Sequence, residues 1–191
     1  MELPRHSRPD RSEAIELRRR AILCASVGAL HDKCVEALCA AGFQVSADRR
    51  DEDGWILARR GAGARPYLVA HLDTVWSQSG DRAPEREVEL TGSGIWVGRN
   101  DRGCGGDDRA GVCVIPEALA HLPDPAGVVF ACGEEVGSLG AARIPAVDLA
   151  DAAYFVQIDR RGTRDAVFYE DTWSADLERE VLAALAPHGF R

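Results

Sequence analysis

The sequence predicts an α/β fold in which a mixed, mostly parallel sheet is flanked by helices. Three short apolar runs bounded by turn residues have the length and composition of buried strands, at 67–70, 128–132 and 154–158. Apolar residues at helical spacing lie between them, over 108–122 and 139–144. Strands that alternate with helices in this way indicate a parallel sheet covered on both faces.

The region before the first run adds helix and hairpin to this sheet. Apolar residues follow a helical period through residues 12–38, with a break expected at Gly28 and a C-terminal helix cap at Gly42. Residues 43–47 and 55–58 predict two antiparallel strands around a polar, acid-rich turn. The turn lacks the ligand spacing of an EF-hand, so we do not expect a calcium loop there.

A second hairpin is expected between the first and second apolar runs. Residues 87–90 and 95–97 are candidate strands around a glycine-containing turn at 91–94. Pro116 lies inside the following helix and predicts a kink or a division, because proline lacks the backbone N–H that a helix interior uses.

Length and charge limit the organisation and the partners. The 191 residues fit a single domain over residues 12–191, preceded by a flexible N-terminus of residues 1–11. The net charge of −8 opposes binding to phosphate backbones and anionic lipids. We therefore expect no nucleic-acid partner and no membrane partner. Lys33 is the only lysine among 23 basic residues, and we treat isolated arginines as solvated surface.

The cysteines and the longest apolar stretch bear on localisation. The six cysteines show no C-x-x-C pair, which favours a reducing, cytoplasmic environment. Residues 21–30 follow three arginines and superficially resemble a signal peptide, but acidic residues precede them. The stretch is shorter than the roughly 18 apolar residues that a membrane span requires.

Ionisable residues follow each of the three apolar runs directly. His71 and Asp73 follow the first run, Glu134 and Glu135 the second, and Asp159 the third. Ligand sites of open α/β sheets lie beyond the carboxyl ends of the strands, so these groups are expected in one crevice. The alternative is that the strands merely end in polar turns.

One motif suits a metal ligand held by a supporting carboxylate, and a second places two carboxylates at the start of a helix. His71 and Asp73 are two residues apart and can project to the same face of an extended strand. The carboxylate could then fix the imidazole tautomer while the other ring nitrogen holds a metal. Asp107 and Asp108 stand at the start of the helix that follows a glycine-rich segment. For this pair the alternative is a helix N-cap.

Adjacent acids at the end of the second run are the most informative pair. Glu134 and Glu135 repel each other unless a cation or a proton separates their roles, so that one ligates a metal and the other acts as a base. A solvated acidic turn is the alternative. Asp159 precedes Arg160 and Arg161, and the alternative for it is a salt bridge.

Other chemistries find little support. The glycine-rich segment lacks both the G-K-[ST] of a P-loop and a complete G-x-G-x-x-G, so nucleotide binding is not expected. No G-x-S-x-G is present for a serine nucleophile.

Four motifs in order carry a resemblance to a known family. They are HLDTV at 71–75, GDDRAG at 106–111, GEEVGSLGA at 133–141 and IDR at 158–160. Together they resemble the zinc-dependent exopeptidase superfamily, in its aminopeptidase-like branches, over roughly residues 35–190. The resemblance implies the fold of that superfamily and a co-catalytic pair of zinc ions.

The resemblance also implies a set of ligands. Asp107 would bridge the two zinc ions and would be joined to Asp108 by a cis peptide bond. His71 and Asp159 would complete the protein ligands of one zinc ion, and Glu135 would belong to the other.

The same resemblance implies the remaining roles and the reaction. Glu134 would be the general base and Asp73 would orient His71. The implied activity is hydrolysis of a peptide or aminoacyl amide bond by metal-activated water. The alternative is a zinc-binding fragment of such an enzyme with weak or no activity.

One departure from the family motivates that alternative. The resemblance implies a further histidine on the second zinc ion, well beyond Asp159, whereas the only histidine after Asp159 is His188. We therefore expect the chain to lack the C-terminal part of the family fold and to have an incomplete second zinc site. An uncovered sheet edge would also favour association, so a homo-oligomer is a further expectation.

Overall fold

The computed structural model describes residues 19–20, 22–50, 52–75, 87–99, 103–160, 164–168 and 174–190. The chain forms two compact units, Met1–Ile158 and Asp159–Arg191. The N-terminus predicted to be flexible, residues 1–11, lies outside the described residues. The prediction of a single domain over residues 12–191 stays a prediction.

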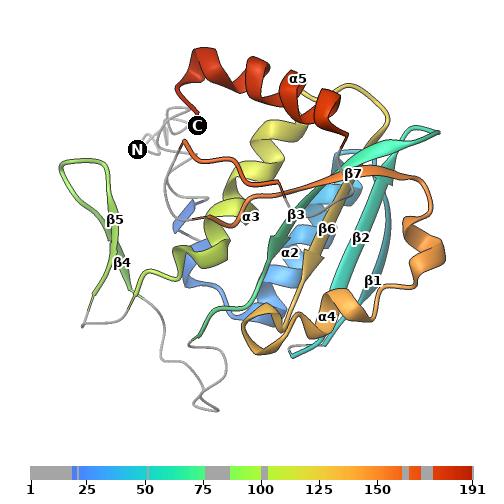
Figure 1. Cartoon of the computed structure of the whole chain (residues 1–191). Coiled ribbons are helices and arrows are strands. Elements are labelled where there is room, and N and C mark those ends of the chain that lie inside the picture. Colours follow the sequence, from blue (N-terminus) through green and yellow to red (C-terminus); the bar gives the residue numbers. More distant parts are fainter. Residues whose placement is uncertain are drawn as a thin grey trace, which may run out of the picture. The chain divides into compact units, whose positions relative to one another are not determined.

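The first unit is built on a five-stranded sheet in the order β1-β2-β6-β3-β7 (Figure 1). The strands are β1 (Gln44–Asp48), β2 (Trp55–Arg60), β3 (Arg65–His71), β6 (Ala126–Ala131) and β7 (Ala152–Gln157). Strand β3 runs parallel to both β6 and β7, while β1 and β2 form the predicted antiparallel hairpin. The mixed sheet with flanking helices confirms the predicted fold class.

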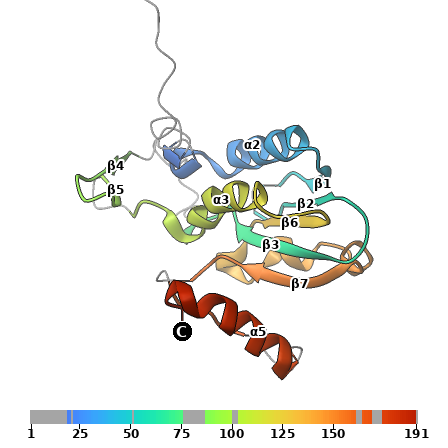
Figure 2. The same ribbon diagram turned by 90° about the horizontal axis from the view of Figure 1, so that it is seen from above.

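Two helices cover one face of this sheet, α2 (Val27–Ala40) and α3 (Gly106–Leu119) (Figure 2). Their apolar residues pack on the alternate residues of β2, β3 and β6 that point to this face. The other face carries a smaller buried cluster: Leu57, Tyr67, Val129 and Ile144. Side chains on both faces of β6 are therefore buried, as expected for a central strand.

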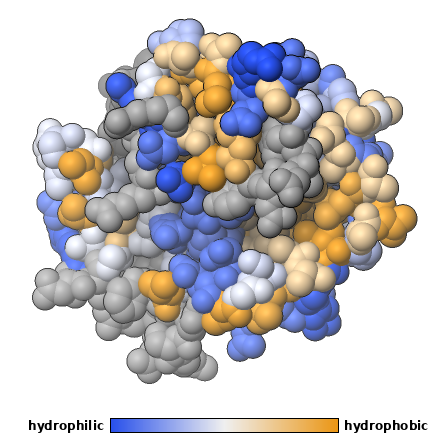
Figure 3. All heavy atoms as spheres, viewed as in Figure 1, coloured by the Kyte–Doolittle hydropathy of each residue, from blue (hydrophilic) through white to orange (hydrophobic). Residues whose placement is uncertain are grey.

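Short elements follow β6 on the way to β7. They are η2 (Glu134–Val136), α4 (Leu139–Ala142) and η3 (Ala146–Leu149). Hydrophobic side chains reach the surface on the side where η3 lies (Figure 3), and Val147 is 79% exposed. Of the helix predicted over 139–144, the structure has the single short turn α4.

The N-terminal helical region differs from the prediction in where it breaks. The break falls at Ala25 and Ser26, and not at Gly28, which lies inside α2. The Ser26 side chain accepts a hydrogen bond from the backbone N–H of Ala29 at 3.3 Å, so Ser26 is the N-cap at which the new helix starts. Gly42 follows α2 with φ +81°, the conformation expected after a helix end.

Helix α3 departs from two expectations. It continues through Pro116 to Leu119, and its non-helical φ/ψ values lie at Asp107 and Asp108 instead.

Arg109 is 1% exposed and is not solvated surface. Its guanidinium donates hydrogen bonds to three carbonyl oxygens of the preceding helical region: those of Ile22, Leu23 and Ala25. A buried arginine thus satisfies carbonyls at a helix end.

Strand β7 is not covered on both faces, contrary to the prediction. Among the strands that the structure describes, it pairs with β3 alone and forms an edge of the sheet. Tyr154, Phe155 and Val156 are 41%, 46% and 40% exposed. An edge strand has a neighbouring strand on one side only. An apolar run is therefore more exposed at the edge than the same run in a central strand.

Of the remaining described elements, the second hairpin was predicted from the sequence, whereas the helices of the second unit were not. Strands β4 (Val88–Leu90) and β5 (Trp96–Gly98) form the second predicted hairpin. The second unit contains α5 (Ala175–Leu185), which Ser174 caps at its start, and the short η4 (Ala186–His188). Of the helices described, none combines the length and the apolar character needed to cross a membrane.

Candidate metal centre

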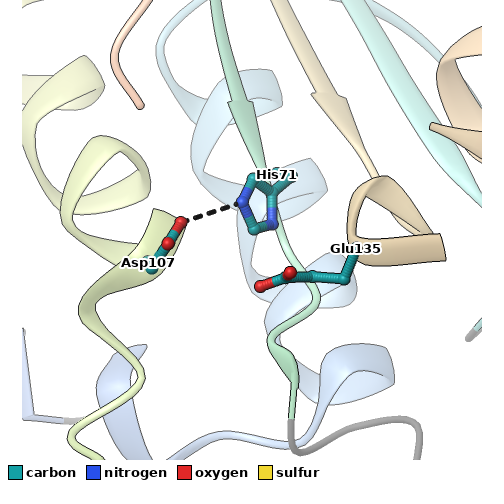
Figure 4. A group of neighbouring side chains, drawn as sticks. All are labelled: His71, Asp107 and Glu135. Carbon is teal, nitrogen blue, oxygen red and sulfur yellow. Dashed lines mark hydrogen bonds and ion pairs between the residues drawn. The ribbon is translucent and has the colours of Figure 1, made fainter. Parts of the chain in front are cut away.

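The candidate site lies at the carboxyl ends of β3 and β6. These strands are parallel neighbours and pair His71 with Ala131, so the segments that follow them emerge side by side. The N-terminus of α3 completes the site (Figure 4). His71 at the end of β3, Asp107 on α3 and Glu135 on η2 point toward one another.

The three side chains present a compact set of donor atoms. One atom from each of His71, Asp107 and Glu135 lies within 4.8 Å of the other two. The Nε2 of His71 is 3.2 Å from Oδ1 of Asp107. Two ligands of one tetrahedral zinc ion, each about 2.0–2.2 Å from it, are roughly 3.4 Å apart. The observed spacing therefore fits a shared metal ion.

The contacts of the two ring nitrogens of His71 also favour a cation nearby. Its Nδ1 is 3.0 Å from the carbonyl oxygen of Asp73, and its Nε2 faces the Asp107 carboxylate. A neutral imidazole has one N–H and cannot donate from both nitrogens. With Nδ1–H donating to Asp73, the Nε2 lone pair points at a carboxylate. A metal ion between them, or a second proton, makes this arrangement favourable.

Asp73 connects the histidine to the loop that carries both glutamates. Its side chain is 5% exposed, and its Oδ1 lies 3.4 Å from Nδ1 of His71. The two carboxylate oxygens accept hydrogen bonds from the backbone N–H groups of Glu134 and Glu135, each at 3.3 Å. Burial raises the pKa of Asp73, but the hydrogen bonds from His71 and these two backbone groups outweigh it and lower the pKa below its usual value. An ionised Asp73 therefore fixes the His71 ring and the loop together.

The two glutamates differ in their surroundings. Oε2 of Glu134 is 3.8 Å from Nε2 of His71, and the Glu134 side chain is 37% exposed. Burial, followed by the negative charge of Asp107, raises the pKa of Glu135 above its usual value; His71 opposes the shift. Burial and the nearby negative charges therefore both disfavour the ionised form of Glu135.

The paired aspartates of α3 divide into an exposed and a buried member. The peptide bond between Asp107 and Asp108 is cis, as the family resemblance implied. The Asp107 side chain is 76% exposed, whereas Asp108 is buried. The Asp108 carboxylate accepts hydrogen bonds from the backbone N–H groups of Gly111 and His71, at 3.0 and 3.3 Å. The capping interpretation thus holds for Asp108, while Asp107 stays available to a ligand.

The structure brings five of the six predicted site residues together: His71, Asp73, Asp107, Glu134 and Glu135. The sixth, Asp159, is the first residue of the second unit, and its role as a ligand stays a prediction. Residue roles within the site remain predictions as well.

Sequence reasoning missed the buried Arg109. A signal was present, because Arg109 precedes Val112 and Cys113 by three and four residues. Both of these are buried, so Arg109 shares the buried face of α3.

Comparisons in sequence return nothing for this chain: no family model and no curated protein matches it. Solved structures do match. A tripeptidase from Staphylococcus aureus has a TM-score of 0.64 at 19% identity. An aminopeptidase PepT from Bacillus cereus has 0.65 at 17%, and an aminoacylhistidine dipeptidase from Vibrio alginolyticus has 0.60 at 19%.

These likenesses establish the fold, which is the one found in these peptidases. They cover 78%, 79% and 84% of this chain. The chain in turn spans 43%, 44% and 36% of the length of those structures. The fold expected from the four motifs is confirmed.

Proposed function

We propose that this protein is a zinc-dependent hydrolase that cleaves peptide or aminoacyl amide bonds. The observation that carries the proposal is the convergence of His71, Asp107 and Glu135 within 4.8 Å at the carboxyl end of a peptidase-type sheet. One imidazole nitrogen and two carboxylates form a donor set that suits zinc and leaves a position for water. The peptidases of similar fold, a tripeptidase among them, favour a peptide as the substrate.

Each side chain has a role that its position supports. His71 and Asp107 would hold one zinc ion, to which Asp159 would add a ligand as the resemblance implies. Asp107 and Glu135 would hold the second ion. Asp73 would keep the His71 ring oriented through its contacts at Nδ1. A bound zinc ion supplies Lewis acidity toward water and the scissile carbonyl.

Glu134 is the proposed general base. Its Oε2 lies 3.8 Å from the histidine nitrogen that faces the proposed metal position. A water molecule beside that position would therefore lie within reach of Oε2. Glu134 would accept a proton at Oε2 and deliver it to the leaving amine. Its partial exposure leaves room for a substrate beside it.

A zinc-binding protein with little or no turnover is the second candidate. Among the histidines of the described residues, only His71 belongs to a group of potential metal ligands. The resemblance requires another histidine for the second zinc ion. Without it the second ion would have only the carboxylates of Asp107 and Glu135. Two carboxylates hold zinc less securely than a set with a further donor, so the second ion would bind weakly.

Hydrolysis before and after metal exchange separates the candidates. The protein is dialysed against a chelator, reloaded with zinc, and assayed on a panel of dipeptides and amino-acid amides. We expect hydrolysis that is lost on chelation and restored by zinc. Zinc binding without hydrolysis would select the second candidate, and hydrolysis unaffected by chelation would exclude both.

A further inference from the structure

The loop that carries Glu134 and Glu135 closes on itself at its base. The backbone N–H of Leu139 donates to the carbonyl of Gly133 at 3.0 Å, and that of Gly140 donates to the carbonyl of Cys132 at 2.9 Å. The two ends of the loop are therefore held together. The position of the base determines where both glutamates lie.

That base rests against the turn between β1 and β2. The backbone N–H of Cys132 donates to the carbonyl of Gly54 at 2.8 Å. A Cβ at Gly140 would overlap the same Gly54 oxygen, and a Cβ at Gly133 would overlap the carbonyl oxygen of Glu52. The turn and the loop base are thus in backbone contact, and a shift of the turn moves the loop.

One arginine ties this turn to the residues that follow the loop. Arg143 is the C-cap of α4, and its Nη2 lies 2.8 Å from Oδ2 of Asp48 at the end of β1. Its Nη1 pairs with Oδ2 of Asp53 in the turn. Arg50 lies 3.3 Å from Asp48 and 3.8 Å from Asp53, so the two carboxylates are shared between two arginines. The planar fork of arginine suits such a bridge, whereas lysine offers one point charge.

We propose that Arg143 is a positioning residue for the metal centre. By bridging Asp48 and Asp53 it holds the β1–β2 turn against α4 and so fixes the loop base between them. The Glu134 and Glu135 backbones then stay in place to donate to Asp73. Arg143 itself makes none of the contacts described for the metal ligands. This inference rests on the proposed function.

The test uses Arg143→Met, which keeps the aliphatic length and removes both ion pairs. Arg99→Met is the matched control, because Arg99 pairs with Glu87 and Glu89 in the separate β4–β5 hairpin. The first measurement is zinc affinity of the full chain by competition with a chromophoric chelator. We expect about a 10-fold loss in Arg143→Met, the lower end of the effect of supporting residues, and none in Arg99→Met. Arg143→Lys should recover part of the loss.

Amide hydrogen exchange is the second measurement, and it does not depend on metal. Arg143→Met should speed exchange at the Cys132, Leu139 and Gly140 amides, while β3 amides keep their protection. Faster exchange with unchanged zinc affinity would overturn the positioning role, since the arginine would then be merely structural. Unchanged exchange would overturn it as well. A wild-type chain that binds no zinc would refute the proposed function, and the exchange data would still show whether the bridge holds the loop.

Discussion

The two ends of the central sheet use the same kinds of charged residue in opposite ways. At the amino end, carboxylates meet cations: Arg65 lies 2.9 Å from Asp151, and Arg59 lies 3.7 Å from both Asp148 and Asp151. Tyr67 donates a hydrogen bond to Asp151 at 2.8 Å and accepts one from Arg59 at 3.1 Å. Every acidic group there has a partner of opposite charge or a hydrogen-bond donor.

The carboxyl end gathers four carboxylates around one imidazole: Asp73, Asp107, Glu134 and Glu135. Within the part of the chain that the structure describes, no arginine or lysine forms an ion pair with any of the four. Like charges gathered without an arginine or lysine cost stability unless a cation joins them. At the amino end the charges are balanced within the fold, whereas the imbalance at the carboxyl end is what the proposed zinc ion would relieve.

The largest effect expected is the loss of the proposed general base at the carboxyl end of the sheet. Glu134→Gln should reduce turnover by about 100-fold to 10,000-fold, because the amide cannot accept the proton. Zinc content should remain, since Glu134 is not among the proposed ligands. Steady-state kinetics and elemental analysis measure the two quantities. Glu36→Gln, an exposed change on α2, is the control, and equal turnover in Glu134→Gln and this control would reject the assigned role.

The next effect separates the two ends directly. Asp73→Asn removes the charge that orients His71 and should weaken zinc binding by about 10-fold to 100-fold. Asp151→Asn makes the same chemical change at the amino end and should leave zinc affinity unchanged. Isothermal titration with zinc measures both variants. Equal losses of affinity would mean that the substitutions act through general destabilisation, contrary to the comparison.

A smaller effect concerns the contribution to stability of the charged cluster at the amino end of the sheet. Tyr67→Phe removes the hydroxyl that donates to Asp151 and should lower the free energy of unfolding by about 1 kcal/mol. The ring of Tyr67, stacked on Phe155 with centroids 5.6 Å apart, is retained. Urea denaturation measures the change. A variant as stable as the wild type would show that the hydroxyl network contributes nothing to folding.

The smallest effect is a pH dependence at the same place. Burial raises the pKa of Asp151, but the hydrogen bond from Tyr67 and the charges of Arg65 and Arg59 lower it below the ordinary value of 3.8. Because the folded-state pKa is the lower one, the carboxylate stabilises the fold above pH 3.8, and this contribution is lost as the pH falls through the folded-state value.

The wild type should therefore lose its stability advantage over Asp151→Asn as the pH is lowered through that range. Denaturation of both proteins at a series of acidic pH values tests this. An advantage that grows toward acid would have the wrong sign.

Sequence alone predicted that most of the candidate site residues lie together, because this juxtaposition depends on local patterns. The apolar runs that become β3 and β6 identify parallel strands, and polar residues directly after such strands must emerge at one edge. His71, Asp73, Glu134 and Glu135 follow from this rule without any three-dimensional information.

Other features depend on distant neighbours and could not be predicted locally. Residues 154–158 have the same apolar character as the central strands, yet β7 lies at the edge of the described sheet, next to β3. The different surroundings of Asp107 and Asp108 depend on a backbone geometry that only the family resemblance suggested. Arg143 is a surface-type residue in sequence, and its bridge joins partners 90 and 95 positions away.

Zinc binding by the dialysed protein tests the central claim most directly. The wild-type chain should retain or take up about one zinc ion tightly, with a rise in its melting temperature on zinc addition, because binding to the folded state stabilises it. His71→Ala should show neither property, while Asp151→Asn should show both. A wild-type chain with no zinc by elemental analysis and no thermal shift would contradict the account. It would mean that the carboxylates of Asp107, Glu134 and Glu135 are a solvated acidic surface.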